Sequence, residues 1–144
     1  MGRRVVSGRE ADDLLELAGR LADSAEVEAR QMGNAICTSV IDPHGNPVLF
    51  RRMTGSLLIA IEMAVRKAET AVALRISTAD LGPLVEPGQP LFPLLAAGAG
   101  RYIAFGGGAP VVGSGGELLA GLGISGGTGD QDAEIASKIV GKYR

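Results

Sequence analysis

The residue with the clearest chemical potential in this sequence is a lysine placed inside an apolar helical stretch. On a helix from about Leu57 to Leu74, steps of 100° put Glu62, Arg66 and Glu69 on one narrow stripe and Lys67 well outside it. A lysine in that position must extend its ammonium to solvent, pair with a carboxylate or face a pocket. Two interpretations remain open. Lys67 either snorkels or forms a structural ion pair at a subunit contact, or it holds an anionic ligand or acts as an acid or base.

A run of three glycines, Gly106, Gly107 and Gly108, followed by Ala109 and Pro110, is the second candidate site. Consecutive glycines expose backbone N–H groups and tolerate positive φ, so they can form an anion-binding nest or let a flat ligand approach the main chain. The structural alternative is a tight connection between two strands. We expect Lys67 and this turn to lie on one cavity wall, with the amine facing the glycine N–H groups across a ligand-sized gap.

Two familiar signatures fit the letters of the sequence but not their required context. Residues 121–126 satisfy G-x-G-x-x-G, yet the first glycines fall inside a predicted strand and the chain lacks room for the acidic residue of a dinucleotide site. Residues 123–127 satisfy G-x-S-x-G, but a nucleophile elbow needs a histidine downstream of the serine. The single histidine, His44, lies upstream in a predicted hairpin turn. Small residues that allow close packing explain both patterns.

Composition excludes several classes of function. The 14 basic and 16 acidic residues give a net charge of -2, which offers no basic field for nucleic acid. One cysteine, Cys37, rules out an internal disulfide and a multi-cysteine zinc site, and we expect no metal site. No apolar run reaches membrane-spanning length, and the first ten residues turn polar too soon for a signal peptide. We therefore expect a cytoplasmic protein that binds neither nucleic acid nor membrane.

The element pattern predicts one α+β domain over residues 1–144, with an antiparallel sheet of about five strands flanked by helices. Helices are expected from a capping box at Ser7 to about residue 33, over 57–74, over 77–83, and over 128–143 with Thr128 and Gln131 as a second capping box. Strands are expected at 35–42, 47–52, 102–105, 109–112 and 117–125. The helix over 57–74 is apolar around most of its circumference, so we expect a homo-oligomer that covers its second side.

The order of short motifs resembles the GlcG/HbpS-like family over about residues 10–140. The segments that carry the resemblance are 41–48 (IDPHGNPV), 52–55 (RMTG), 67–71 (KAETA), 87–91 (PGQPL), 105–110 (FGGGAP), 123–128 (GISGGT) and Gln131-Asp132. The resemblance implies a profilin-like fold, oligomers from dimers to octamers, and haem binding or degradation. It also implies kinship with the domain attached to corrinoid adenosyltransferases of the PduO type.

Two functional hypotheses follow. In the first, the protein binds haem or another flat, carboxylate-bearing molecule, with ligand-binding residues Arg52, Met53, Lys67, Gly106, Gly107, Gly108 and Pro110. Haem-binding relatives place an axial histidine in the first helix, where this sequence has none. In the second, it is a small isomerase, lyase or cyclase without a redox cofactor, in which Lys67 and a nearby carboxylate, Glu62, act as acid and base.

Overall fold

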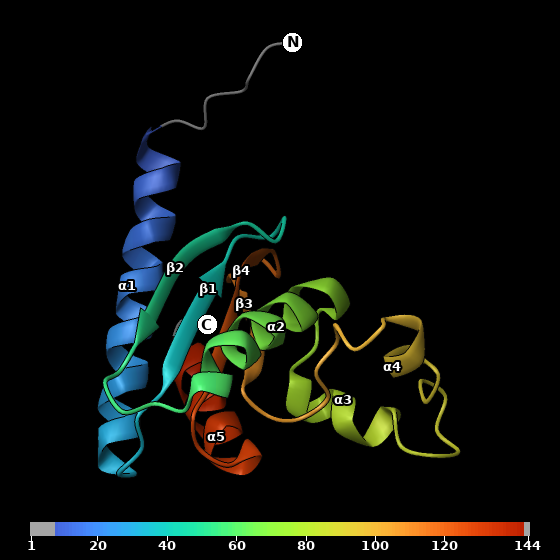
Figure 1. Ribbon diagram of the computed structural model, residues 1–144. Coiled ribbons are helices and arrows are strands. Elements are labelled where there is room, and N and C mark those ends of the chain that lie inside the picture. Colours follow the sequence, from blue (N-terminus) through green and yellow to red (C-terminus); the bar gives the residue numbers. More distant parts are fainter. Residues whose placement is uncertain (1–7, 143–144) are drawn as a thin grey trace.

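The computed structural model describes residues 8–142 and shows a four-stranded antiparallel sheet between two layers of helices (Figure 1). The sheet order is β2-β1-β4-β3. In chain order the elements are α1 (Gly8–Gln31), β1 (Cys37–Ile41), β2 (Pro47–Arg52), α2 (Leu58–Leu74), α3 (Thr78–Leu84), α4 (Leu94–Ala97), β3 (Gly108–Val112), β4 (Leu118–Ser125) and α5 (Gly129–Gly141). Helix α2 packs on one face of the sheet, and α1 and α5 pack on the other. The start predicted at Ser7 lies outside the described residues.

The α+β class is confirmed, but one of the five predicted strands is wrong. Residues 102–105 do not join the sheet. The backbone N–H of Ile103 donates instead to the hydroxyl of Thr70 on α2, 3.0 Å away, so this segment is tied to a helix side chain rather than to a neighbouring strand. A short apolar run without clear alternation does not tell a strand of the sheet from an extended segment that bonds to a helix side chain.

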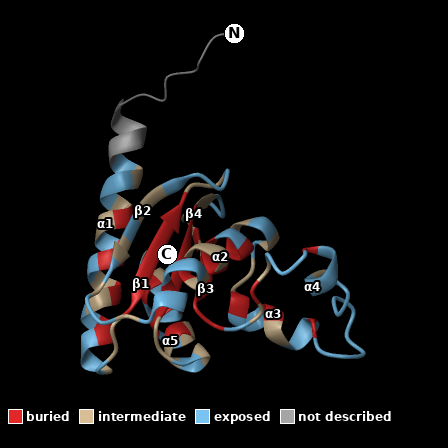
Figure 2. Cartoon of the chain, in the orientation of Figure 1, coloured by how far each residue is buried: buried red, intermediate tan, exposed pale blue. Residues whose placement is uncertain are grey.

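The core lies between the sheet and the α1/α5 layer. Figure 2 shows β1 buried, whereas the edge strand β2 and much of the helix surface are intermediate or exposed. Aliphatic residues fill this layer, as expected for a chain with 3% aromatic residues. The main buried members are Ala18, Leu21, Ala25, Ile36, Val40, Val111, Leu122, Ile124, Ile135 and Ile139.

Glycines on β4 bring α2 unusually close to the opposite face of the sheet. A β-carbon on Gly123 would overlap the carbonyl oxygen of Ala64, and one on Gly121 would lie 2.8 Å from the carbonyl oxygen of Ala68. The alanines of α2 and the glycines of β4 therefore form one tight contact. Residues 121–126, which match the dinucleotide pattern G-x-G-x-x-G, therefore allow α2 to pack closely on the sheet, as expected from their small size.

Candidate functional site

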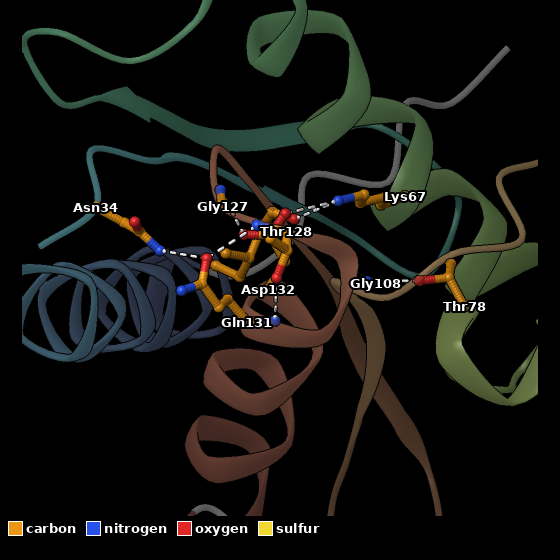
Figure 3. A network of polar contacts seen from close by, with 9 residues as sticks. Asn34, Lys67, Thr78, Gly108, Gly127, Thr128, Gln131 and Asp132 are labelled. Atoms are coloured by element: carbon orange, nitrogen blue, oxygen red, sulfur yellow. Dashed lines mark hydrogen bonds and ion pairs between the residues drawn. The ribbon is translucent and has the colours of Figure 1, made fainter. Parts of the chain in front are cut away.

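Lys67 is a fully buried cation within its own chain. It lies on the sheet-facing side of α2, and its side chain is 1% exposed. The ammonium donates to the carbonyl oxygen of Ile124 at 2.9 Å and to the carboxylate of Asp132 at 3.1 Å (Figure 3). A buried charge requires such partners, because an unpaired one would lose its hydration without compensation. Lys67 therefore joins α2 to the end of β4 and to α5.

Asp132 is positioned by the first turn of α5. Its Oδ1 atom accepts the N–H of Gly127 at 3.0 Å, while Oδ2 accepts Lys67. The turn itself is fixed by the predicted capping box, in which Thr128 and Gln131 satisfy each other's backbone N–H groups. Asn34, just after α1, adds a hydrogen bond of 3.0 Å to Gln131. This network, drawn in Figure 3, holds the carboxylate still with respect to the lysine.

The triple-glycine turn contacts Lys67 directly, so the ligand-sized gap expected between them is wrong. A β-carbon on Gly107, whose φ is +131°, would lie 2.8 Å from the lysine Nζ. On one side, Gly106 packs against the backbone of Gly129 in α5. On the other, Gly108 donates its N–H to the Thr78 hydroxyl at 2.8 Å. The three glycines are needed because backbone and side chains approach them from three directions.

An open pocket of about 220 Å³ nevertheless lies beside the lysine. We call it the Lys67 pocket; its principal lining residues are Lys67, Asp132, Phe105, Ser125, Leu57 and Ile59. The Lys67 ammonium lies 5.1 Å from the centre of the Phe105 ring, within the range of a cation–π contact. An ammonium has three N–H donors, and two are engaged by Ile124 and Asp132. The third makes no hydrogen bond within the described residues.

Burial and the ion pair act in opposite directions on the lysine. Loss of hydration lowers the pKa of Lys67, while the charge and hydrogen bond of Asp132 raise it, and the net effect is a pKa below the ordinary value of 10.5. The ion pair also makes the pocket wall nearly neutral overall.

The remaining predicted site residues lie elsewhere. Glu62 is on the outer side of α2 and pairs with Arg66 at 2.8 Å, so it does not reach Lys67. Met53 packs against the α1/α5 core, and its sulfur accepts the N–H of Ile36. Arg52 is exposed at the end of β2, opposite Cys37 in the register, and is not among the residues that line the pocket.

Gly107, Gly108 and Pro110 line a second hollow of about 500 Å³ on the far side of the glycine turn, together with residues of α5 and the α2–α3 connection. The backbone N–H of Gly108 points away from β4, towards Thr78. In a strand the backbone N of the residue two positions later points to the same side, here the edge of β3 that pairs with no other strand. That residue is Pro110, which has no N–H to offer. Proline at such an edge position discourages the addition of a further strand, which gives Pro110 a structural role.

Sequence reasoning missed three residues of the pocket: Asp132, Phe105 and Ser125. In the sequence, Asp132 appears only as part of the Gln131-Asp132 motif, although a lysine in an apolar arc requires a carboxylate from another element. Phe105 was assigned to a strand, and Ser125 was treated only as a rejected nucleophile. Their nearness to Lys67 depends on tertiary packing between segments more than 30 residues apart in the chain.

The fold and the pocket together define a class: small α+β domains with an open pocket beside a buried lysine. The family model described as "Haem degrading protein HbpS-like" matches residues 14–140, and the chain belongs to this family. The resemblance stated from the motifs is thereby confirmed.

Two proteins and one crystal structure are similar to this chain over most of its length. The corrinoid adenosyltransferase PduO of Salmonella typhimurium is 37% identical over 121 residues, which is 84% of this chain but 36% of PduO. The chain thus spans about a third of that relative's length. An uncharacterised 15.0 kDa protein of Citrobacter freundii is 34% identical over 122 residues and 85% of each chain. The crystal structure of a PduOC–haem complex superposes with a TM-score of 0.83 at 35% identity, covering 90% of this chain and 93% of that one.

The pocket residues do not make a conventional haem site. Iron in haem proteins is held by His, Cys, Met or Tyr, and His44 is exposed on the β1–β2 hairpin. Met63 is the one sulfur-bearing side chain that lines the Lys67 pocket. The volume of the Lys67 pocket, about 220 Å³, is also below the roughly 300–1,000 Å³ of pockets that enclose drug-sized ligands. In the described part of the chain, no group of three or more His, Cys, Asp or Glu side chains could hold a metal ion.

None of the described helices is long and apolar enough to cross a membrane.

Proposed function

We propose that this protein binds a small, flat organic molecule that bears a carboxylate or carbonyl oxygen, and that the Lys67 pocket is the binding site. The observation that supports this most directly is the buried ammonium that lines an open pocket with one donor still free. The aromatic ring of Phe105 offers a face for the flat part of the ligand. The haem complex of a relative shows that a domain of this family can hold a flat, carboxylate-bearing molecule.

The alternative hypothesis of an acid–base enzyme gains nothing from the predicted pair. Glu62 is engaged by Arg66, and the carboxylate that meets Lys67 is committed to Gly127 as well. Both members of the buried pair are thus held by structural partners.

The binding experiment uses three probes: benzoate, phthalate and hemin. Benzoate and phthalate are titrated by calorimetry, and hemin by its Soret absorption. The variant that removes the site is Lys67→Met/Asp132→Asn, in which both charges vanish together and the amide oxygen introduced at this position can still accept the Gly127 N–H. The matched control is Lys138→Met, which removes a lysine whose ion pair with Glu28 lies at the surface.

We expect the carboxylate probes to bind the wild-type protein and the Lys138→Met variant, and to lose most of their affinity for the double variant. If no probe binds, or if each binds the double variant as well as the wild type, the proposed site is wrong. A hemin Soret shift that survives in the double variant would assign haem to another place on the molecule.

We further propose that the protein is a homo-oligomer and, as expected from the sequence, cytoplasmic. The support for oligomerisation is the amino-terminal end of α2, where Leu57, Leu58, Ile59 and Ile61 remain exposed in the single chain, Leu58 to 84%. Exposed apolar side chains gathered in one place are typical of protein–protein contacts. A monodisperse monomer in light scattering would refute this part of the proposal.

A further inference from the structure

The Lys67 pocket is open on the side where exposed apolar residues gather. Leu57 and Ile59 line the pocket itself, and Phe105 lies at its rim with half of its surface exposed. Leu58, Ile61 and Phe50 extend the same apolar region along α2 and onto β2. We call these six residues the α2 patch. A partner that covers Leu57, Ile59 and Phe105 also covers the opening of the Lys67 pocket.

A second apolar group lies on a projecting segment, residues 85–100, which we call the arm. It contains α4 and extends away from the sheet (Figure 1), and within the described chain α4 packs on no other helix or strand to a substantial extent. Its exposed apolar side chains are Leu91, Phe92 and Leu95, with Leu84 at its base in α3; Phe92 is 52% exposed. Residues 87–100 carry no charge.

In the single chain the projecting part of the arm, with α4, lies away from the amino end of α2 (Figure 1), while its last residue, Gly100, accepts a hydrogen bond from Arg66 of α2 at 3.3 Å. The arm follows the carboxyl end of α2 through α3, whereas the patch is built on the amino end of the same helix (Figure 1). The part of the patch on α2 is similarly uncharged, since residues 53–61 contain no Asp, Glu, Lys or Arg. Two apolar surfaces at separate places on one molecule can be buried together when two copies exchange them around a two-fold axis.

We propose that the arm of a second copy covers the α2 patch and completes the Lys67 pocket, so that each binding site is formed by two chains. The area is sufficient. The ten exposed apolar side chains of patch and arm present on the order of 1,000 Å² per chain, and a stable interface buries roughly 800 Å² per partner. The proposal also accounts for the small volume of the pocket, about 220 Å³, because one of its walls belongs to the partner. It rests on the proposed function only in naming the pocket as a binding site.

The contact is tested by cross-linking without any ligand. Leu58→Cys and Phe92→Cys chains are co-expressed, one of them tagged, and oxidised; the native Cys37 is fully buried and stays out of the reaction. We expect a disulfide-linked dimer that contains one chain of each kind. The matched control replaces Leu58→Cys by Val27→Cys, an exposed apolar position on α1, and should give no such dimer. Cross-links confined to like chains, or the absence of any cross-linked dimer, would overturn the proposal.

Ligand binding separates this inference from the proposed function. Phe92→Asp changes a residue of the arm that does not line the Lys67 pocket of its own chain, and it should reduce phthalate affinity at least about tenfold by removing the partner's wall. Wild-type phthalate affinity in Phe92→Asp would overturn the shared site and leave the proposed function standing. The mixed cross-link together with no probe bound by the wild type would confirm the interface and refute the proposed function.

Discussion

Replacement of Lys67 by methionine probes how the buried pair contributes to both stability and binding. Methionine keeps the apolar stem, so from the sequence alone we expect this substitution to abolish binding of an acidic ligand with almost no change in melting temperature. The structure changes that expectation, because Lys67→Met leaves Asp132 buried without its cation. Removing one partner of a buried pair typically costs about 3–5 kcal/mol. For a chain of this length that corresponds to a fall of roughly 10–15 °C in melting temperature.

Three variants isolate the cause of this effect. Lys67→Met/Asp132→Asn removes both charges and should recover most of the loss, to within about 2 kcal/mol of the wild type. Lys138→Met removes an exposed ion pair with Glu28 and should cost less than about 1 kcal/mol. The assay is urea unfolding followed by circular dichroism at one fixed protein concentration, since association contributes to apparent stability. If Lys67→Met and Lys138→Met proved equally stable, the buried ion pair would not exist in solution as described.

Three further predictions follow from the same contacts. Gly123→Ala should destabilise the protein by more than about 2 kcal/mol in urea unfolding, because its β-carbon would overlap Ala64. Gly19→Ala, on an unobstructed part of α1, should stabilise the protein by about 0.5–1 kcal/mol. Equal effects of the two substitutions would contradict the close approach of α2 to β4. Thr128→Ala should lower stability by about 1 kcal/mol and weaken carboxylate binding, because the capping box positions Asp132; unchanged binding and unfolding would show the cap to be dispensable. Because the pKa of Lys67 is lowered in the folded protein, the unfolded chain binds more protons than the folded one between that pKa and 10.5. The free energy of unfolding of the wild type should therefore rise relative to that of Lys67→Met as the pH rises through this window, measured by denaturation at each pH. Parallel plots of stability against pH for the two proteins would contradict the lowered pKa.

The sequence predicted the helices and most of the sheet because these depend on local patterns. The Thr128/Gln131 capping box and both strands of the β1–β2 hairpin lie where short-range rules place them. The α+β class followed from the order of the elements. Residues 102–105 were assigned wrongly because their backbone is satisfied by Thr70, a side chain more than 30 positions away, which no local pattern reports.

The candidate site could be predicted only in part. An apolar arc with one lysine identified Lys67 as unusual, and the glycine run beside it marked a place of close approach. The partner carboxylate was misassigned because Glu62 shares a helix with Lys67, whereas Asp132 reaches it from another element. Nothing in the sequence distinguishes these two acidic residues until α5 is placed against the end of β4.

The most direct test of a ligand site at Lys67 is native mass spectrometry of freshly purified protein, which reports bound small molecules and subunit number together. We expect oligomers of the wild type and of Lys138→Met that carry a small-molecule adduct, released by collisional activation and absent from Lys67→Met/Asp132→Asn. An adduct of the same mass and occupancy on the double variant would contradict it, as would wild-type protein that stays free of adduct even in the presence of added phthalate.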